Sequence, residues 1–323
     1  GLPTALLVIC YNRPEYLIRT LGAVRKCVLA CGYPPPPPLT TRAPRHLPAS
    51  NPPAVFVSQD GNIGTVSSVI SKFQTELIST RPDVSFTHLR HNQEARRGDD
   101  GQGYSKLARH FGWALNQVFL EFKHPRVIIL EDDLEIAPDF FQYFDAVAPL
   151  LESDPSLLGA TAWNDMGQAK FASDPTVLYR SDFFGGLGWM LTAGSWAELG
   201  PKWPTGYWDD WLREPPQRQG RSFIRPEVSR SYTFGKKGVS ASQFFNKYLG
   251  NIKLNDNPVT WSAADVAALA KTAYDPVFFA AVNAAPMVSV ADAMQKRCRG
   301  ASQDYRVTYQ GFGRGAGYEG VAQ

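Results

Sequence analysis

The run Val127-Ile128-Ile129-Leu130-Glu131-Asp132-Asp133 joins four apolar residues directly to three acids. A short, continuous apolar run that ends abruptly in polar residues is typical of a strand buried on both faces, as in the middle of a parallel sheet. The acids then lie at the carboxyl end of that strand, which is the edge where open α/β sheets bind their ligands. Residues 127–133 therefore predict both a central strand and a candidate site at its end.

The residues before this run alternate in the same way between strand and helix. Ala5 to Cys10 is a second apolar run, and Tyr11-Asn12-Arg13-Pro14 follows it. Periodicity predicts further strands at 54–57 and 84–89, and helices at 15–31, 66–78 and 104–122. This alternation predicts an α/β fold with a doubly wound, mostly parallel sheet. Past residue 255 the pattern weakens to a helical stretch at 263–283 and strand-like pieces near Val288 and at 305–309.

Composition limits the class of protein. The 323 residues are 44% hydrophobic and 20% charged, with a net charge of +3. These values are typical of a globular chain and give no reason to propose a nucleic-acid or membrane-surface partner. No apolar stretch is long enough to span a bilayer, and the chain begins at Gly1 without a signal-like segment, so we expect an excised domain. Any membrane anchor would lie upstream of it.

Cysteine and proline usage add two expectations. Four cysteines are too few for a disulfide scaffold, and Cys27 and Cys31 lack companion ligands for a zinc site. Nine prolines fall within residues 33–53, five of them consecutive. We expect an exposed insertion there, and favour a plain surface loop over a proline-rich ligand for a partner domain.

Charged residues collect at the predicted carboxyl edge of the sheet. Arg13, Asp60 and the three acids at 131–133 each follow a predicted strand. Consecutive acids repel one another unless a cation is near, and oxygen ligands suit Mg²⁺ or Mn²⁺. The alternative is that these acids are solvated where the chain meets water, and the spacing alone favours neither interpretation.

Two more segments have the composition of a ligand site. Tyr207-Trp208-Asp209-Asp210-Trp211 places aromatic rings beside carboxylates, which suits a sugar, although a tryptophan-rich core segment would have the same composition. Gly235-Lys236-Lys237-Gly238-Val239-Ser240 has cations, a hydroxyl and flexible backbone that suit a diphosphate, although the motif alone favours a solvated basic turn. Motifs for dinucleotides, for the Walker phosphate loop and for serine hydrolases are absent from the sequence.

Taken together and in order, the motifs resemble the N-acetylglucosaminyltransferase I family. The resemblance runs from about residue 4 to residue 255, with a weaker match near 304–320. It is carried by Gln102-Gly103-Tyr104, Ala108-Arg109-His110, Trp113-Ala114-Leu115, Glu131-Asp132-Asp133-Leu134-Glu135, Ala137-Pro138-Asp139-Phe140-Phe141, Ala162-Trp163-Asn164-Asp165, Gly186-Leu187-Gly188-Trp189, Pro201-Lys202-Trp203-Pro204, Trp208-Asp209-Asp210-Trp211, Arg218-Gln219-Gly220-Arg221, Ile224-Arg225-Pro226-Glu227 and Gly238-Val239-Ser240.

The resemblance implies a metal-dependent glycosyltransferase. Its fold would be GT-A, with a catalytic domain at 1–255 and a small, shortened carboxyl-terminal subdomain at 256–323. The enzyme would transfer GlcNAc from UDP-GlcNAc, with inversion, to the 2-hydroxyl of the α-1,3-linked mannose of a Man5 N-glycan on glycoproteins. It would do so in the Golgi lumen as a type II membrane protein whose anchor is absent from this chain.

The resemblance also implies roles for individual residues. Asp209 corresponds to the catalytic base, and Asp133 to the protein ligand of Mn²⁺. Contacts with the donor are implied for Arg13, Asp60, His110, Glu131, Asp132, Trp208 and Ser240. Of these, Glu131 and Trp208 would contact the sugar.

Departures from the family pattern concern cysteines and one acid. Animal members carry two pairs of cysteines at the positions of Tyr11 with Gly61 and of Gly159 with Phe223, so both disulfides are missing here. Asn12 stands where an Asp is usual, beside a uridine contact.

Three alternative functions remain open at this point. A sister transferase acts on O-linked mannose, but Asp209-Asp210 and Gly238-Val239-Ser240 favour the N-glycan branch. A sugar-binding protein without catalysis would not need Asp133 and Asp209. A glycosidase with two carboxylates would need no nucleotide and no added metal.

Overall fold

The computed structural model describes residues 2–30, 52–94, 103–236, 245, 248–294, 305–308 and 319–322. The chain divides into two compact units, Gly1–Val266 and Ala267–Gln323. No helix in the described ranges is long and apolar enough to cross a membrane. Most of the predicted insertion at 33–53 lies outside the described residues. Cys31, Ser240 and Cys298 also lie outside them.

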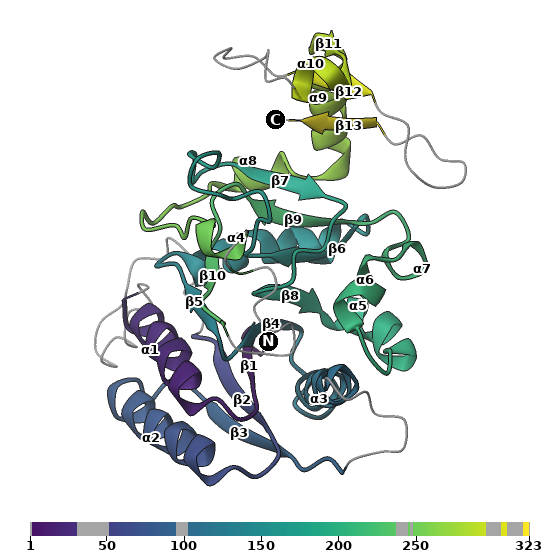
Figure 1. Ribbon diagram of the computed structural model, residues 1–323. Coiled ribbons are helices and arrows are strands. Elements are labelled where there is room, and N and C mark those ends of the chain that lie inside the picture. Colours follow the sequence, from purple (N-terminus) through teal and green to yellow (C-terminus); the bar gives the residue numbers. More distant parts are fainter. Residues whose placement is uncertain are drawn as a thin grey trace. The chain divides into compact units, whose positions relative to one another are not determined.

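The first unit is built on an eight-stranded sheet in the order β3-β2-β1-β4-β8-β6-β9-β7 (Figure 1). Strands β3, β2, β1 and β4 are parallel to one another, β8 is antiparallel to β4 and β6, β9 is parallel to β6, and β7 is antiparallel to β9. Their bounds are β1 Ala5–Cys10, β2 Ala54–Asp60, β3 Phe86–His91, β4 Arg126–Glu131, β6 Leu157–Thr161, β7 Leu178–Ser181, β8 Trp189–Thr192 and β9 Ser222–Pro226. The predicted α/β fold with a mostly parallel sheet is confirmed.

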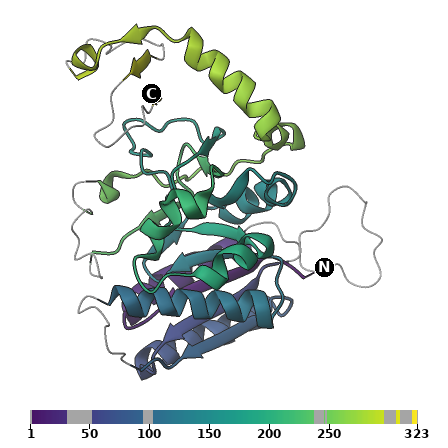
Figure 2. The ribbon, with the colours of Figure 1, turned by 90° about the vertical axis from the view of Figure 1, so that its right-hand side faces the viewer.

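Helices cover both faces of the parallel half of this sheet. In Figure 1, α1 (Pro14–Ala30) and α2 (Gly64–Thr80) lie on the side opposite α3 (Tyr104–Asn116), which faces the viewer in Figure 2. Ala5, Leu7 and Ile9 of β1 belong to the core that α3 covers. Leu6 and Val8, which alternate with them, are also buried because the other helices cover the opposite face. This two-sided burial explains why β1 and β4 are apolar without alternation.

The rest of this unit consists of shorter elements around the other half of the sheet. A two-stranded antiparallel sheet pairs β5 (Leu134–Ile136) with β10 (Ser231–Thr233). The helices are α4 Phe140–Ser153, α5 Ala193–Leu199, α6 Trp208–Arg213, α7 Pro215–Arg218 and α8 Ala263–Ala267, with 3-10 turns at Gly200–Lys202 and Leu249–Asn251.

Several predicted boundaries differ from the structure by one to three residues, and two of the differences have a clear hydrogen-bonding reason. The third strand is Phe86–His91 rather than 84–89, because the backbone N–H of Val84 donates to Arg81 in the turn that follows α2. The helix expected at 104–122 ends at Asn116 and continues as a π-helical turn, Gln117–Glu121, which Phe122 closes by donating its N–H to the Gln117 carbonyl. Periodicity does not distinguish these hydrogen-bonding patterns.

Both pairs of positions that the resemblance assigns to cysteines in other members are neighbours here. A Cβ atom on Gly61 would lie 3.7 Å from Cε2 of Tyr11, and one on Gly159 would lie 3.3 Å from Cε1 of Phe223. Gly159 and Phe223 are register partners between β6 and β9. In each pair an aromatic ring lies beside a glycine.

The second unit is small. It contains α9 (Lys271–Ala284), α10 (Val290–Met294) and a three-stranded sheet of β11 (Met287–Val288), β12 (Tyr305–Thr308) and β13 (Glu319–Ala322). Strand β12 pairs in parallel with β11 and antiparallel with β13. The helical stretch that the sequence predicts at 263–283 is divided between α8 and α9, and the strand-like pieces near Val288 and at 305–309 correspond to β11 and β12.

Candidate functional site

The carboxyl ends of adjacent parallel strands bring the predicted charged residues to one edge of the sheet. Asp60 ends β2 and Glu131 ends β4, on either side of β1, and Arg13 follows β1 just before α1 begins. Asp132 and Asp133 form the turn between β4 and β5. We call Arg13, Glu131, Asp132 and Asp133 the acidic rim.

Arg13 holds two of the rim acids. Its guanidinium makes an ion pair with Asp132, and its Nη1 lies 2.9 Å from Oδ2 of Asp133. Asp132 is almost fully buried, and its backbone carbonyl accepts the Thr20 hydroxyl at 2.8 Å. The side chain of Asp133 is 16% exposed, so it is the more accessible of the two carboxylates.

The rim carries more negative charge than Arg13 neutralises. Burial raises the pKa of Glu131, and the charges of Asp133, Asp132 and Asp209 raise it further, while Arg13 opposes the shift. Burial also raises the pKa of Asp132 against the opposing effect of Arg13. A site in which carboxylates disfavour one another's charge, with oxygen atoms as its donors, fits a hard divalent cation.

Gly235 brings the backbone against the rim. The N–H of Phe234 donates to the Asp133 carbonyl at 3.0 Å, and a Cβ atom on Gly235 would overlap the Asp133 carboxylate, with Cγ at 2.9 Å. Only glycine fits beside Asp133 in this arrangement. Gly235, the first residue of the predicted diphosphate segment, therefore lies against the Asp133 carboxylate.

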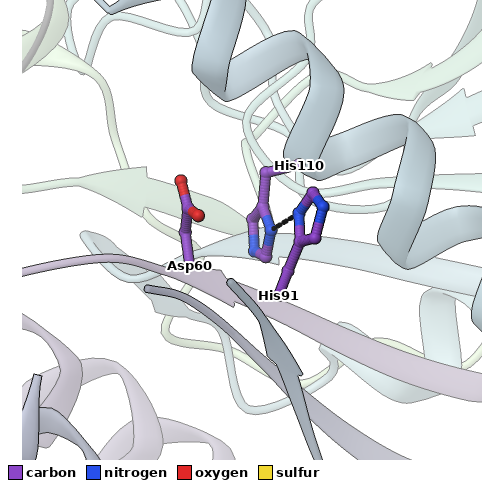
Figure 3. Close-up of side chains that lie close together, drawn as sticks. All are labelled: Asp60, His91 and His110. Atoms are coloured by element: carbon purple, nitrogen blue, oxygen red, sulfur yellow. Dashed lines mark hydrogen bonds between the residues drawn. The ribbon is translucent and has the colours of Figure 1, made fainter. Parts of the chain in front are cut away.

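Asp60 and His110 lie together with a third residue, His91 (Figure 3). The Nδ1 atoms of the two histidines are 3.1 Å apart, and the ring of His91 stacks on Trp113 at 4.4 Å. Burial lowers the pKa of His110 to about 4, so this imidazole is neutral near pH 7. Sequence reasoning missed His91, although it ends β3 as the register partner of Asp60, and parallel pairing would have placed it there.

Asp209 is separate from the rim acids in sequence, but its charge affects one of them. It lies in the first turn of α6, its side chain is 43% exposed, and its Oδ2 is 3.3 Å from Nη1 of Arg213. The same nitrogen lies 2.7 Å from Oδ1 of Asp210. Since the charge of Asp209 contributes to raising the pKa of Glu131, Asp209 is close enough to the rim to influence its charge.

The aromatic residues beside Asp209 differ in exposure. Trp208 is 6% exposed and stacks on Phe111 at 4.5 Å and on Trp189 at 5.4 Å between ring centroids. Trp208 is therefore a core residue, as the alternative of a tryptophan-rich core segment expects. The sugar contact predicted for Trp208 stays a prediction. Tyr207 is half exposed and stacks on Tyr104 at 4.4 Å. Its φ of 47° is in the left-handed region, which costs a residue other than glycine about 1 kcal/mol or more.

The fold and the site together define a class of protein. It is a doubly wound α/β protein with an acidic, cation-type site at the carboxyl edge of its sheet, where this class binds its ligands. The family profile of GNT-I matches residues 42–321, and the chain belongs to the GNT-I family. The predicted GT-A class of the α/β fold agrees with this membership.

A curated relative covers nearly the whole chain. The chain is 42% identical over 327 aligned positions to the alpha-1,3-mannosyl-glycoprotein 2-beta-N-acetylglucosaminyltransferase of Arabidopsis thaliana. The alignment covers 98% of this chain and 66% of that relative, so the chain spans slightly less than two thirds of the relative's length.

Solved structures give more distant likenesses. The mannosyltransferase PcManGT from Pyrobaculum calidifontis, in complex with GDP-Man and Mn2+, is 16% identical with a TM-score of 0.42, covering 92% of this chain and 79% of that one. Mouse xyloside xylosyltransferase 1 is 12% identical with a TM-score of 0.34, covering 79% and 85%.

Proposed function

We propose that this protein transfers GlcNAc from UDP-GlcNAc, with inversion, to the 2-hydroxyl of the α-1,3-linked mannose of a Man5 N-glycan. Family membership and 42% identity to the plant enzyme support the reaction. The observation that carries the proposal is the pairing of the acidic rim with a separate, accessible Asp209 beside it. A transfer of this kind needs a cation near the leaving diphosphate and a base on the acceptor side.

The rim and its neighbours would bind the donor. Asp133 would be the protein ligand of Mn²⁺, because it is the more accessible of the two carboxylates that pair with Arg13. The proposed contacts with UDP-GlcNAc are Arg13, Asp60, His110, Glu131, Asp132, Trp208 and Ser240. Of these, Trp208 would act by holding the start of α6 in place, since its ring is packed in the core.

Asp209 would act on the acceptor. Its carboxylate accepts the proton of the mannose 2-hydroxyl while that oxygen forms its bond to the anomeric carbon. The bond from the anomeric carbon to the diphosphate oxygen breaks on the opposite face, and UDP leaves with the electron pair. A bound Mn²⁺ supplies Lewis-acid stabilisation to that leaving group. The setting we propose is the Golgi lumen, with a glycoprotein as acceptor and an anchor outside this chain.

The proposal is tested by transfer of labelled GlcNAc to a Man5 glycan with Mn²⁺ and with EDTA. Transfer that requires the metal and modifies the α-1,3 arm supports it. Transfer only to an O-mannosyl peptide would assign the protein to the sister activity instead. Release of sugar from a glycan without nucleotide or metal would indicate a glycosidase.

Replacement of Gly235 by Ala is expected to weaken Mn²⁺ binding about 10-fold or more, because the added Cβ displaces the Asp133 carboxylate. The loss of the free-Mn²⁺ electron paramagnetic resonance signal on titration measures this directly. Gly206→Ala is the matched control, since the atoms nearest its added Cβ belong to Ser105 at 3.7 Å or more. Equal Mn²⁺ affinity in both variants would contradict the role of Asp133.

Replacement of Tyr207 by Ala is expected to raise KM for the glycan acceptor by a few-fold to about 10-fold, the size of an aromatic stacking contribution. Tyr207 is the exposed ring nearest Asp209 in the sequence, and its stack on Tyr104 holds it in place. Steady-state kinetics at saturating donor measure the change. Tyr207→Phe retains the ring and should retain KM. A Phe variant as impaired as the Ala variant would contradict stacking as the cause.

A further inference from the structure

Asp60, His91 and His110 form a compact group that the proposed reaction does not fully use. Each offers one ligand atom, and these atoms all lie within 4.8 Å of one another (Figure 3). They come from three elements, since Asp60 ends β2, His91 ends β3 and His110 lies in α3. All three are at least partly shielded from solvent.

The surroundings of His110 favour one of its two tautomers. Its Nε2 lies 3.1 Å from the Ser58 carbonyl and 3.3 Å from the Ser58 hydroxyl. Because the carbonyl can only accept, we assign the hydrogen to Nε2. In the neutral ring, Nδ1 is then a bare lone pair, and it faces Nδ1 of His91 at 3.1 Å. With this tautomer, the hydrogen between the two nitrogens belongs to His91, and a metal ion bound by both nitrogens would replace it. An imidazole anchored through its other nitrogen by a carbonyl is typical of protein metal ligands.

Hydrogen bonds also orient Asp60, the oxygen donor of the group. One Asp60 oxygen accepts the Gln93 side-chain amide at 2.8 Å, and the Oε1 atom of Gln93 in turn accepts Nε of Arg109 at 3.1 Å. The ring of His91 is fixed by its stacking on Trp113. All three candidate ligands therefore have outer partners that orient them.

We propose that Asp60, His91 and His110 form a second cation site, which binds Zn²⁺ or a similar borderline ion with water completing the coordination. Two imidazoles and one carboxylate are a common set of three protein ligands for zinc with an open position. The acidic rim offers only oxygen atoms, which suit Mn²⁺. The two sites therefore differ in the class of ion that they prefer.

Occupancy of this site has a consequence that rests on the proposed function. Asp60 and His110 are also proposed donor contacts, so a zinc ion bound to them and UDP-GlcNAc would exclude each other. Zinc is then an inhibitor that competes with the donor and not with Mn²⁺ at Asp133.

Direct metal binding tests the site independently of catalysis. The metal-free protein is titrated with Co²⁺, and the visible absorption of four-coordinate Co²⁺ is followed; Zn²⁺ then displaces it. His91→Gln is expected to weaken binding by at least about 10-fold, since even loss of an outer partner of a metal ligand reaches that size. His88→Gln is the matched control, because His88 lies on the same strand and hydrogen-bonds to Gln59. Asp133→Asn removes the rim as a competing site, and the absorption of four-coordinate Co²⁺ should still appear at the same Co²⁺ affinity.

The outcomes separate the two proposals. Equal Co²⁺ affinity in the wild type and in His91→Gln, with both folded by circular dichroism, would overturn the zinc site. Zinc binding without donor-competitive inhibition would overturn the consequence for catalysis. If the protein lacks transferase activity altogether, the proposed function fails, while the Co²⁺ titration still decides the site.

Discussion

Replacement of Asp209 by Asn is expected to lower kcat for GlcNAc transfer by about 100- to 10,000-fold, the range that a positioned general base contributes. The amide has nearly the shape of the carboxylate but cannot accept the hydroxyl proton. Donor binding in the presence of Mn²⁺ should be retained, because Asp209 lies outside the rim. Initial rates with a Man5 acceptor measure kcat, and calorimetry with UDP-GlcNAc measures donor binding.

Asp210→Asn is the matched control for this experiment. Both acids lie in the first turn of α6 and both pair with Nη1 of Arg213, but the side chain of Asp210 is 71% exposed. Its replacement alters the same ion pair without removing the proposed base, and kcat should change only a few-fold. A comparable loss in both variants would mean that the Arg213 pairing, and not proton transfer, is responsible.

Replacement of Arg230 by Met is expected to lower the free energy of unfolding by about 3–5 kcal/mol, the cost of leaving a buried charge without its partner. Arg230 and Asp139 are both fully buried, and Nη2 of Arg230 lies 3.0 Å from Oδ2 of Asp139. The same carboxylate accepts the side-chain amide of Asn255 and the N–H of Val259 at 3.1 Å, so it joins distant segments of the first unit. Urea unfolding followed by tryptophan fluorescence measures the change.

Two further variants check that the uncompensated charge is the cause. Adding Asp139→Asn to Arg230→Met removes the remaining charge but keeps an acceptor for Asn255, and should restore much of the lost stability. Arg19→Met breaks an exposed pair with Glu135 and should cost less than about 1 kcal/mol. A double variant no more stable than Arg230→Met would indicate lost packing of the long Arg230 side chain instead.

The parallel half of the sheet and the acidic rim were predictable from local sequence. Apolar runs at 5–10 and 127–130 have to be buried on both faces, and residues that follow parallel strands meet at one edge. These rules placed Arg13, Asp60 and Asp133 correctly at that edge without any tertiary information. The resemblance added candidate roles, such as a base at Asp209, that no spacing rule provides.

Other features depended on contacts between distant residues. The sequence did not distinguish Trp208 from Tyr207, but packing against Phe111 and Trp189 buries the first ring, while the second stays half exposed. The sequence likewise did not indicate a contact between His91 and His110, which are 19 residues apart. Strand register and the position of α3 bring their nitrogens together.

By itself, then, the sequence determined the strand–helix alternation and the acidic edge, because hydrophobic periodicity and strand direction are local properties. Tertiary structure alone determined which aromatic ring faces solvent, that Gly235 lies against the Asp133 carboxylate, and that the Nδ1 atoms of two histidines are 3.1 Å apart. The physical reason is that exposure and side-chain contact depend on the packing of elements far apart in the chain, which no local pattern records.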